Sequence, residues 1–405
     1  MNILLIADAV FEDKPGGSRT AAKELARCLV KRGHGVVLLV NQVIEGKPYE
    51  EQLWNGVTVV RAPRSKAGVA GMRRACEDIV KRFGPFDIAH IHFAYAGVGP
   101  LWSSALRGVP TVRTFHGPWC EEGWVEDTSK ARGGLGIAKA RAKRTARHWV
   151  EQDSLRRAES IISLSAFMSG ILTDHFDVKS ERIARIDGGV DVERFHVPKD
   201  THALRERLGL PVDRPIALTV RRLAARMGLE NLVRSMPAVL REVPDLYLVI
   251  AGKGPERARL EQLSKDLCVD GSIHFAGFVP DEDLAGLYGA ADLFVLPTTA
   301  LEGFGLVIVE SLACGTPVIG APVGAIPELL APLEPKLLAR EASSEAIGEA
   351  IIEFFKTDWG DRLTADVVRR YVLSRYTWDM AADQTIDLYD RFAAKKGTNG
   401  NRITV

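Results

Sequence analysis

Residues 2–33 read NILLIADAVFEDKPGGSRTAAKELARCLVKRG, and this stretch decides the fold. An apolar run over residues 2–9 is followed by a polar loop that contains Gly16 and Gly17. After the loop, apolar residues recur at helical spacing until Gly33, a residue that commonly ends helices. The stretch therefore predicts a strand, a glycine loop and a helix.

The same alternation of strands and helices continues along the chain. Further strands are predicted at VVLLV (36–40), VTVVRA (57–62), DIAHIHF (87–93), TVRTFHG (111–117) and SIISLS (160–165). Near Asp187 the rhythm changes, and a second series runs from IALTV (216–220) to TPVIG (316–320). Alternation of this kind favours parallel sheets with helices on both faces.

We therefore expect an α/β protein with two doubly wound Rossmann-like domains. The first would span residues 1–190 and the second residues 191–377, with a helix over 378–392 packing back on the first domain. A length of 405 residues agrees with two domains of ordinary size.

Composition restricts the classes of partner. The 53 basic and 52 acidic side chains give a formal charge of +1, which gives nucleic-acid binding no general electrostatic support. Five cysteines without metal-ligand spacing indicate a reduced, cytoplasmic protein, and no apolar run approaches the roughly 18 residues of a membrane span.

The segment ALEGFGLVIVESLACGTPVIG (300–320) carries two isolated carboxylates, Glu302 and Glu310. Burying an unpaired carboxylate is costly, so each needs a partner, which ligand hydroxyls could provide. Eight residues turn a helix about 80° beyond two full turns, so one extended ligand could meet both. The alternative is a capping glutamate and a buried glutamate paired within the protein.

This segment resembles the donor site of the family 4 retaining glycosyltransferases of the GT-B fold, and the resemblance covers nearly the whole chain. It implies that Glu302 meets the sugar hydroxyls and Glu310 the ribose of a nucleoside diphosphate sugar. Gly303, Phe304 and Gly305 would belong to the same donor site. The donor is then a substrate, and neither a cofactor nor a metal ion is expected.

A second segment, VRRLAARMGLEN (220–231), resembles the arginine and lysine pair that holds the donor diphosphate in this family. Arg222 occupies the arginine position. Met227 stands where the family has lysine, and Arg226 precedes it by one residue, so Arg226 would supply a displaced second cation. Two cations suit a diphosphate leaving group on which negative charge develops. The alternative is a solvated basic surface.

First-domain residues complete the predicted site. His116, at the end of a predicted strand, resembles the family histidine near the transferred sugar. The loop with Gly16 and Gly17 would face donor and acceptor, although a tight turn would also explain these glycines. In the second domain, Gly252 opens a loop that resembles part of the nucleotide pocket. His90 and His92 remain unassigned.

Two charged segments allow two interpretations each. The acidic run at residues 281–283 is similar to a metal-binding motif, but its place at a predicted helix start favours capping. Residues 130–147 hold seven basic residues and no acidic one. They are either a solvated helix face or a contact with an anionic membrane or acceptor.

The resemblance thus implies a retaining transferase that moves a sugar from a nucleoside diphosphate, with UDP favoured over GDP, to an unidentified hydroxyl acceptor. A sugar-nucleotide epimerase or phosphorylase on the same scaffold is one alternative, because one fold hosts many chemistries. A non-catalytic nucleotide-sugar-binding subunit is another.

Overall fold

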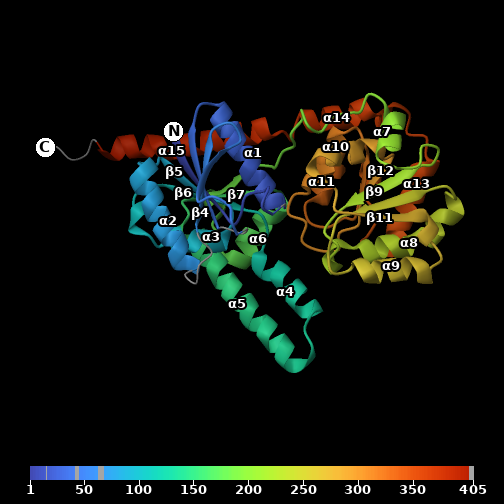
Figure 1. The fold of residues 1–405 in the computed structure, drawn as a ribbon, viewed down its shortest axis with the longest axis horizontal. Helices are drawn as coiled ribbons and strands as arrows, with labels where there is room; N and C mark the ends of the chain where they lie inside the picture. The colour runs from blue at the N-terminus through green and yellow to red at the C-terminus, as the bar shows by residue number, and fades with distance from the viewer. Residues whose placement is uncertain (15, 42–44, 63–67, 401–405) are drawn as a thin grey trace. The chain divides into compact units, whose positions relative to one another are not determined.

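The computed structural model describes residues 1–14, 16–41, 45–62 and 68–400. The chain forms two compact units, which are coloured along the sequence in Figure 1. Unit 1 consists of Met1–Gly189 and Trp378–Val405, and unit 2 consists of Val190–Thr377.

The described part of unit 1 contains one sheet with the strand order β3-β4-β2-β1-β5-β6-β7-β8. The strands are β1 (Asn2–Ala7), β2 (Gly35–Asn41), β3 (Glu50–Leu53), β4 (Val57–Ala62), β5 (Ile88–Ile91), β6 (Thr111–Phe115), β7 (Ser160–Ser163) and β8 (Ile183–Arg185). Neighbouring strands run parallel, as predicted, apart from the antiparallel pair β3 and β4.

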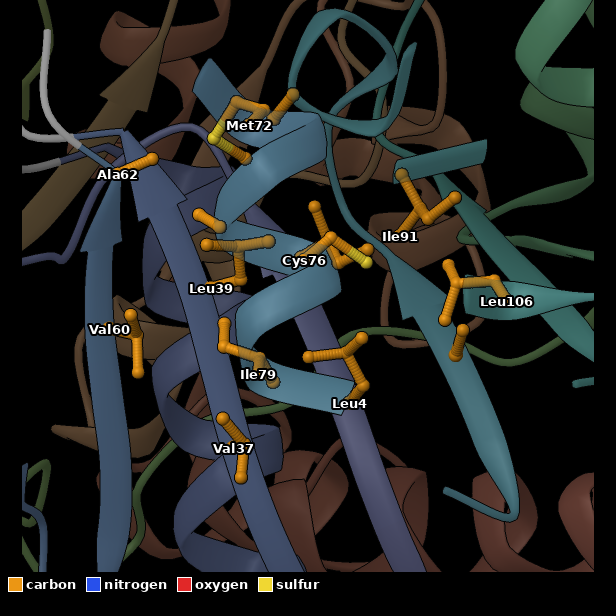
Figure 2. Close-up of a cluster of buried hydrophobic side chains, with 14 of the residues drawn as sticks. Leu4, Val37, Leu39, Val60, Ala62, Met72, Cys76, Ile79, Ile91 and Leu106 are labelled. Atoms are coloured by element: carbon orange, nitrogen blue, oxygen red, sulfur yellow. The ribbon is translucent and has the colours of Figure 1, made fainter. Parts of the chain in front are cut away.

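Helices accompany this sheet along the chain. They are α1 (Gly17–Lys31), α2 (Gly68–Phe83), α3 (Ala94–Leu101), α4 (Trp119–Ser129), α5 (Gly133–Arg157), α6 (Ala166–Phe176) and α15 (Trp378–Gly400). Figure 2 shows how α2 meets the sheet: Met72, Cys76 and Ile79 face Leu39 and Val60 across a buried cluster. The spacing of three and four residues places these α2 side chains on one helix face.

The C-terminal helix α15 belongs to unit 1. It packs against α1, and its Tyr389 hydroxyl hydrogen-bonds to Nδ1 of His90 in β5 at 2.5 Å. Nε2 of His90 bonds to the Thr114 hydroxyl at 2.6 Å, so this histidine has a packing role. The helix extends beyond the predicted residues 378–392 to Gly400, which agrees with the helix-forming run AAKK that follows.

Unit 2 has a parallel sheet with the described order β11-β10-β9-β12-β13. Its strands are β9 (Ile216–Val220), β10 (Tyr247–Ala251), β11 (Ile273–Gly277), β12 (Leu293–Leu296) and β13 (Val318–Gly320). Its helices are α7 (Thr201–Arg207), α8 (Leu229–Glu242), α9 (Arg257–Asp266), α10 (Asp281–Ala290), α11 (Leu306–Ala313), α12 (Ile326–Leu330), α13 (Ser344–Lys356) and α14 (Ala365–Leu373). Both units are thus doubly wound α/β folds.

Within the described ranges, no helix combines the length and apolar character that crossing a membrane requires.

Candidate functional site

The direction of chain winding in unit 2 reverses between β9 and β12. From β9 the chain moves outward to β10 and β11, and it then returns to the other side of β9 as β12 and β13. Parallel sheets bind ligands outside the carboxyl ends of their strands at such a reversal. The two segments that leave this point are residues 221–228 after β9 and residues 297–305 after β12.

Glu302 and Arg221 meet at this point. Nη1 of Arg221 donates to Oε2 of Glu302 at 2.8 Å, and the Thr298 hydroxyl lies 3.4 Å from the same oxygen. The side chain of Arg221 is 8% exposed and that of Glu302 is 14% exposed. The carboxylate therefore has a charged partner inside the protein.

Close backbone contacts hold the segments around Glu302 in place. A Cβ on Gly228 would lie 1.7 Å from the carbonyl oxygen of Pro297, so only glycine allows this approach. A Cβ on Gly324 would lie 2.3 Å from the carbonyl oxygen of Glu302, which accepts the Ala325 amide at 3.0 Å. Leu301 has a φ of 60°, a costly value for leucine, immediately before Glu302.

The start of α11 follows Glu302 directly. Gly305 has a φ of 97°, in the left-handed region that favours glycine, and immediately precedes the helix. The ring of Phe304 is buried and packs edge-on against Tyr376. The start of α11 therefore lies beside the Glu302 carboxylate, as predicted. Backbone N–H groups at a helix start favour anionic ligands, so this end of α11 suits a phosphate.

Glu310 lies one helix turn from the end of α11 and has a partner from another helix. The hydroxyl of Tyr288, in α10, donates to Oε2 of Glu310 at 2.8 Å. Burial raises the pKa of Glu310, while the tyrosine hydrogen bond and the charge of Arg194 oppose this effect. Both predicted carboxylates thus have protein partners, one ionic and one neutral.

The two predicted cations lie in the segment after β9. Arg222 is exposed, and Arg226 is partly buried with its Nη1 3.3 Å from the carbonyl oxygen of Leu301. Met227 is buried, and its Sδ lies 2.8 Å from Nη2 of Arg221. Arg221, to which the sequence resemblance assigns no role, is therefore the arginine in contact with Glu302.

Gly252 has a steric role that the structure makes explicit. It follows β10 with a φ of 134°, and a Cβ there would lie 1.8 Å from the carbonyl oxygen of Arg221. The Arg221 amide donates to the carbonyl oxygen of Ala251 at 2.9 Å. The loop after β10 therefore fixes the backbone from which the Arg221 side chain extends.

His116 follows β6 in unit 1, and its Nε2 lies 3.2 Å from Nδ1 of His92, which follows β5. Burial lowers the pKa of His116 well below its ordinary value, and the neighbouring His92 and Arg113 lower it further. Burial also lowers the pKa of His92 to about 3. Two neutral imidazoles result, one of which donates to the other.

The first glycine loop leads directly into α1. Gly16 has a φ of 160°, which is extended backbone, so a left-handed turn does not account for this glycine. Its carbonyl oxygen accepts the amide of Thr20 at 2.9 Å, and Gly17 begins the helix. The guanidinium of Arg19 fills the space beside Gly16 and pairs with Asp8.

Ion pairs involve most of the charged side chains in the acidic run at residues 281–283 and in the basic run at residues 130–147. Asp281 and Asp283 lie in the first turn of α10, where they pair with Arg194 and Arg207 at 2.7 and 3.0 Å. Neither caps the helix through a side-chain hydrogen bond, so the expected capping is wrong and the ion pairs replace it. No cluster of potential metal ligands occurs within the described ranges.

Four of the seven basic residues at 130–147 pair with acidic residues of α4. These pairs are Lys130–Glu126 at 2.9 Å, Lys143–Asp127 at 2.9 Å, Arg144–Glu121 at 2.6 Å and Arg147–Asp127 at 2.8 Å. The sequence could not show this because the acidic partners lie on the preceding helix. Much of the basic charge is thus balanced locally.

Two family models match the chain. "Glycosyltransferase Family 4" matches residues 15–194 and "Glycosyl transferases group 1" matches residues 200–367. The chain is similar to a D-inositol 3-phosphate glycosyltransferase of Acidothermus cellulolyticus, with 28% identity over 95% of this chain and 87% of the relative. It is 34% identical, over 44% of this chain and 49% of the relative, to a GDP-mannose-dependent alpha-(1-6)-phosphatidylinositol monomannoside mannosyltransferase of Mycolicibacterium smegmatis.

Solved structures share the fold. A sucrose-phosphate synthase from Thermosynechococcus elongatus superimposes with a TM-score of 0.81 at 24% identity, over 98% of this chain and all of that one. Anabaena HepE in complex with UDP-glucose gives a TM-score of 0.73 at 19% identity, over 96% of this chain and all of that one. The two family models together with this fold place the chain in the family 4 glycosyltransferases of the GT-B fold.

Proposed function

We propose that this glycosyltransferase moves a sugar from a nucleoside diphosphate sugar to a hydroxyl acceptor with retention of anomeric configuration and without a metal ion. The observation that carries the proposal is the pair Arg221–Glu302 beside the start of α11, at the point where strand winding reverses. Cations, helix amides and carboxylates at one point match a ligand that combines a diphosphate with sugar hydroxyls.

Each group then has a chemical role. Arg222 and Arg226 balance charge on the leaving diphosphate, assisted by the amides at Gly303–Gly305. Glu302 accepts hydrogen bonds from the sugar, and Glu310 accepts them from the ribose. His116, neutral because its pKa is low, offers an uncharged hydrogen-bonding group near the transferred sugar. Because Glu302 is ion-paired, it is a poor nucleophile, which favours a route in which the leaving phosphate helps to deprotonate the acceptor.

A thermal-shift screen against UDP-sugars and GDP-sugars, followed by transfer assays with and without EDTA, tests this proposal. The relatives suggest both bases, since one is GDP-mannose-dependent and one fold neighbour was solved with UDP-glucose. A donor at about 100 times its Kd should stabilise the fold by roughly 2.7 kcal/mol. Unchanged melting with every donor, or activity that is lost with EDTA and restored by Mn²⁺ or Mg²⁺, would contradict it.

We also propose that the tip of the α4–α5 hairpin contacts an anionic surface. Arg132, Lys139 and Arg141 are exposed there, as are Leu135, 89% exposed, and Ile137, 40% exposed. Exposed apolar groups flanked by basic ones are typical of segments that lie in a membrane interface.

A further inference from the structure

We infer that Arg221 supplies a further cation to the diphosphate site, beside Arg222 and Arg226, in place of the lysine whose position Met227 occupies. The inference rests on the proposed function and deepens it. It concerns a residue next to Arg222 that the resemblance does not assign.

The position of Arg221 is fixed from both sides. It follows β9 directly, its amide donates to Ala251 at 2.9 Å, and Gly252 closes over its carbonyl oxygen. The side chain then passes through a largely buried space, in which it is 8% exposed. A guanidinium held in this way loses little further freedom when it binds a ligand.

The two ends of the guanidinium face different environments. Nη1 bonds to the Glu302 carboxylate at 2.8 Å, and Nη2 faces the Met227 sulfur at 2.8 Å. A thioether is a weak, uncharged acceptor, so this end of the cation has no anionic partner at Met227. A phosphate oxygen is a much stronger acceptor for the same group.

The contact with Met227 also explains the departure from the expected lysine. A lysine at position 227 would place a second positive charge beside the Arg221 guanidinium. With methionine at position 227, the Arg221 guanidinium supplies the positive charge instead, and it lies next to the Met227 side chain. Arg226, the displaced cation predicted from the sequence, donates to Leu301 and so also supports the segment that carries Glu302.

Glu302 is linked to the same cation. An arginine has five N–H donors in a planar fork, so Arg221 can keep its bond to Glu302 while it donates to a phosphate oxygen. One residue then orients the carboxylate that meets the sugar and neutralises the charge that leaves with the diphosphate. Loss of Arg221 should therefore affect phosphate binding and turnover more than binding of the nucleoside.

Calorimetric titration of the full chain with UDP and with uridine tests this inference, with GDP and guanosine used if the donor screen selects guanine. Arg221→Gln should weaken UDP binding by about 10- to 100-fold and leave uridine binding within threefold. Arg234→Gln removes an exposed arginine of α8 that pairs with Glu230, and this matched control should bind UDP as the wild type does.

The double variant Arg221→Gln with Met227→Lys restores a cation at the neighbouring position, so it should recover most of the UDP affinity and transfer rate. It also keeps the test valid if Arg221→Gln alone fails to fold. Wild-type binding of neither UDP nor GDP would refute the proposed function itself. Wild-type binding with unchanged affinity in Arg221→Gln would overturn only this inference, as would equal losses for UDP and uridine without rescue by Met227→Lys.

Discussion

Glu310 is compatible with both interpretations of its sequence, as a ligand-binding carboxylate and as a carboxylate paired within the protein. A buried carboxylate was expected to need either a ligand or a protein partner, and Tyr288 provides a protein partner. A carboxylate accepts several hydrogen bonds, so one bond from tyrosine leaves capacity for a ribose hydroxyl. Burial raises the pKa of Glu310, so this carboxylate takes up a proton at a higher pH than an exposed glutamate does.

We expect Glu310→Gln to weaken UDP affinity by about tenfold, the effect of one lost charge-assisted hydrogen bond. In the wild type, affinity should fall as the pH drops through the raised pKa, because protonation turns an acceptor oxygen into a donor. The variant should lack the part of this acid-side decline that Glu310 causes, while the part caused by protonation of the UDP phosphate, whose second pKa is about 6, remains. Calorimetry with UDP between pH 5 and 8 measures both effects, and a variant with wild-type affinity but lower melting temperature would show that Glu310 is only structural.

A second buried carboxylate lies in unit 1, where Glu151 of α5 is 1% exposed. It accepts the backbone amides of Trp119 and Cys120 at 2.8 and 2.9 Å, and so fixes the start of α4 two residues after Gly117. Burial raises the pKa of Glu151 from 4.5 to about 7, although these hydrogen bonds oppose it.

The raised pKa predicts a specific pH dependence of stability. The folded state holds the Glu151 proton more tightly than the unfolded state, so stability falls as the pH rises from about 4.5 to 7. The difference between these pKa values corresponds to on the order of 3 kcal/mol. Urea unfolding at pH 5 and pH 8 should show this loss in the wild type.

Glu151→Gln should remove that part of the pH dependence, because glutamine does not titrate. Glu349→Gln, at an exposed position on α13, serves as the control and should retain the wild-type profile. Parallel profiles for wild type and Glu151→Gln would show that Glu151 ionises normally.

Arg221 shows where sequence reasoning at the residue scale reached its limit. The resemblance aligned Arg222 with a known position, and adjacent residues carry no signal of which side chain turns inward. The local backbone decides this: the Arg221 side chain is only 8% exposed, whereas Arg222 is exposed. The choice depends on contacts with Gly252, Met227 and Glu302, which are distant from one another in sequence.

At the scale of elements, hydrophobic runs and glycines predict the alternation of strands and helices, but they do not predict β3. Its sequence, EEQL, lacks an apolar alternation, and it forms a hairpin with β4 around Trp54, Asn55 and Gly56. The Asn55-Gly56 pair is the local signal for this hairpin, because Asn-Gly favours a tight turn between strands. The three residues have positive φ values of 50°, 62° and 126°.

The α4–α5 hairpin is the element for which structure changes the prediction most. Figure 1 shows the two helices side by side, extending from the sheet of unit 1. Opposite charges face one another across the hairpin, which explains why a run of seven basic residues does not form a uniformly basic surface. The unbalanced basic residues lie toward the tip.

We therefore expect anionic vesicles to bind the protein through the tip. Replacing Arg132, Lys139 and Arg141 with glutamine should reduce co-sedimentation with such vesicles, while Lys143→Gln with Arg144→Gln, at ion-paired positions, should have a smaller effect. Binding should weaken as salt shortens the Debye length from about 10 Å at 0.1 M to about 3 Å at 1 M. If the wild type ignores anionic vesicles at low salt, the tip is a solvated surface.

At the scale of the whole molecule, the proposed donor groups are distributed unequally. Arg221, Arg222, Glu302 and Glu310 lie in unit 2, which is a continuous stretch of chain, whereas unit 1 is completed by the returning helix α15. A ligand that lacks the sugar presents a base, a ribose and a diphosphate. Apart from the loop with Gly16 and Gly17 in unit 1, the groups proposed to bind these parts belong to unit 2. The two units should consequently respond differently to UDP.

Hydrogen exchange of the intact protein with and without UDP tests this difference. Some amides of unit 2 exchange only when the structure that binds UDP opens. UDP at about 100 times its Kd should slow the exchange of these amides by up to about 100-fold. Protection should be largest at residues 221–228, 252–256 and 301–310, which surround Arg221 and Glu302. Amides of β1, β2 and α15 in unit 1 provide the internal control, because no group proposed to bind UDP lies on these three elements. Protection confined to unit 1 would place the nucleotide in the wrong unit, and it would refute the assignment of Glu302 and Glu310 to the donor.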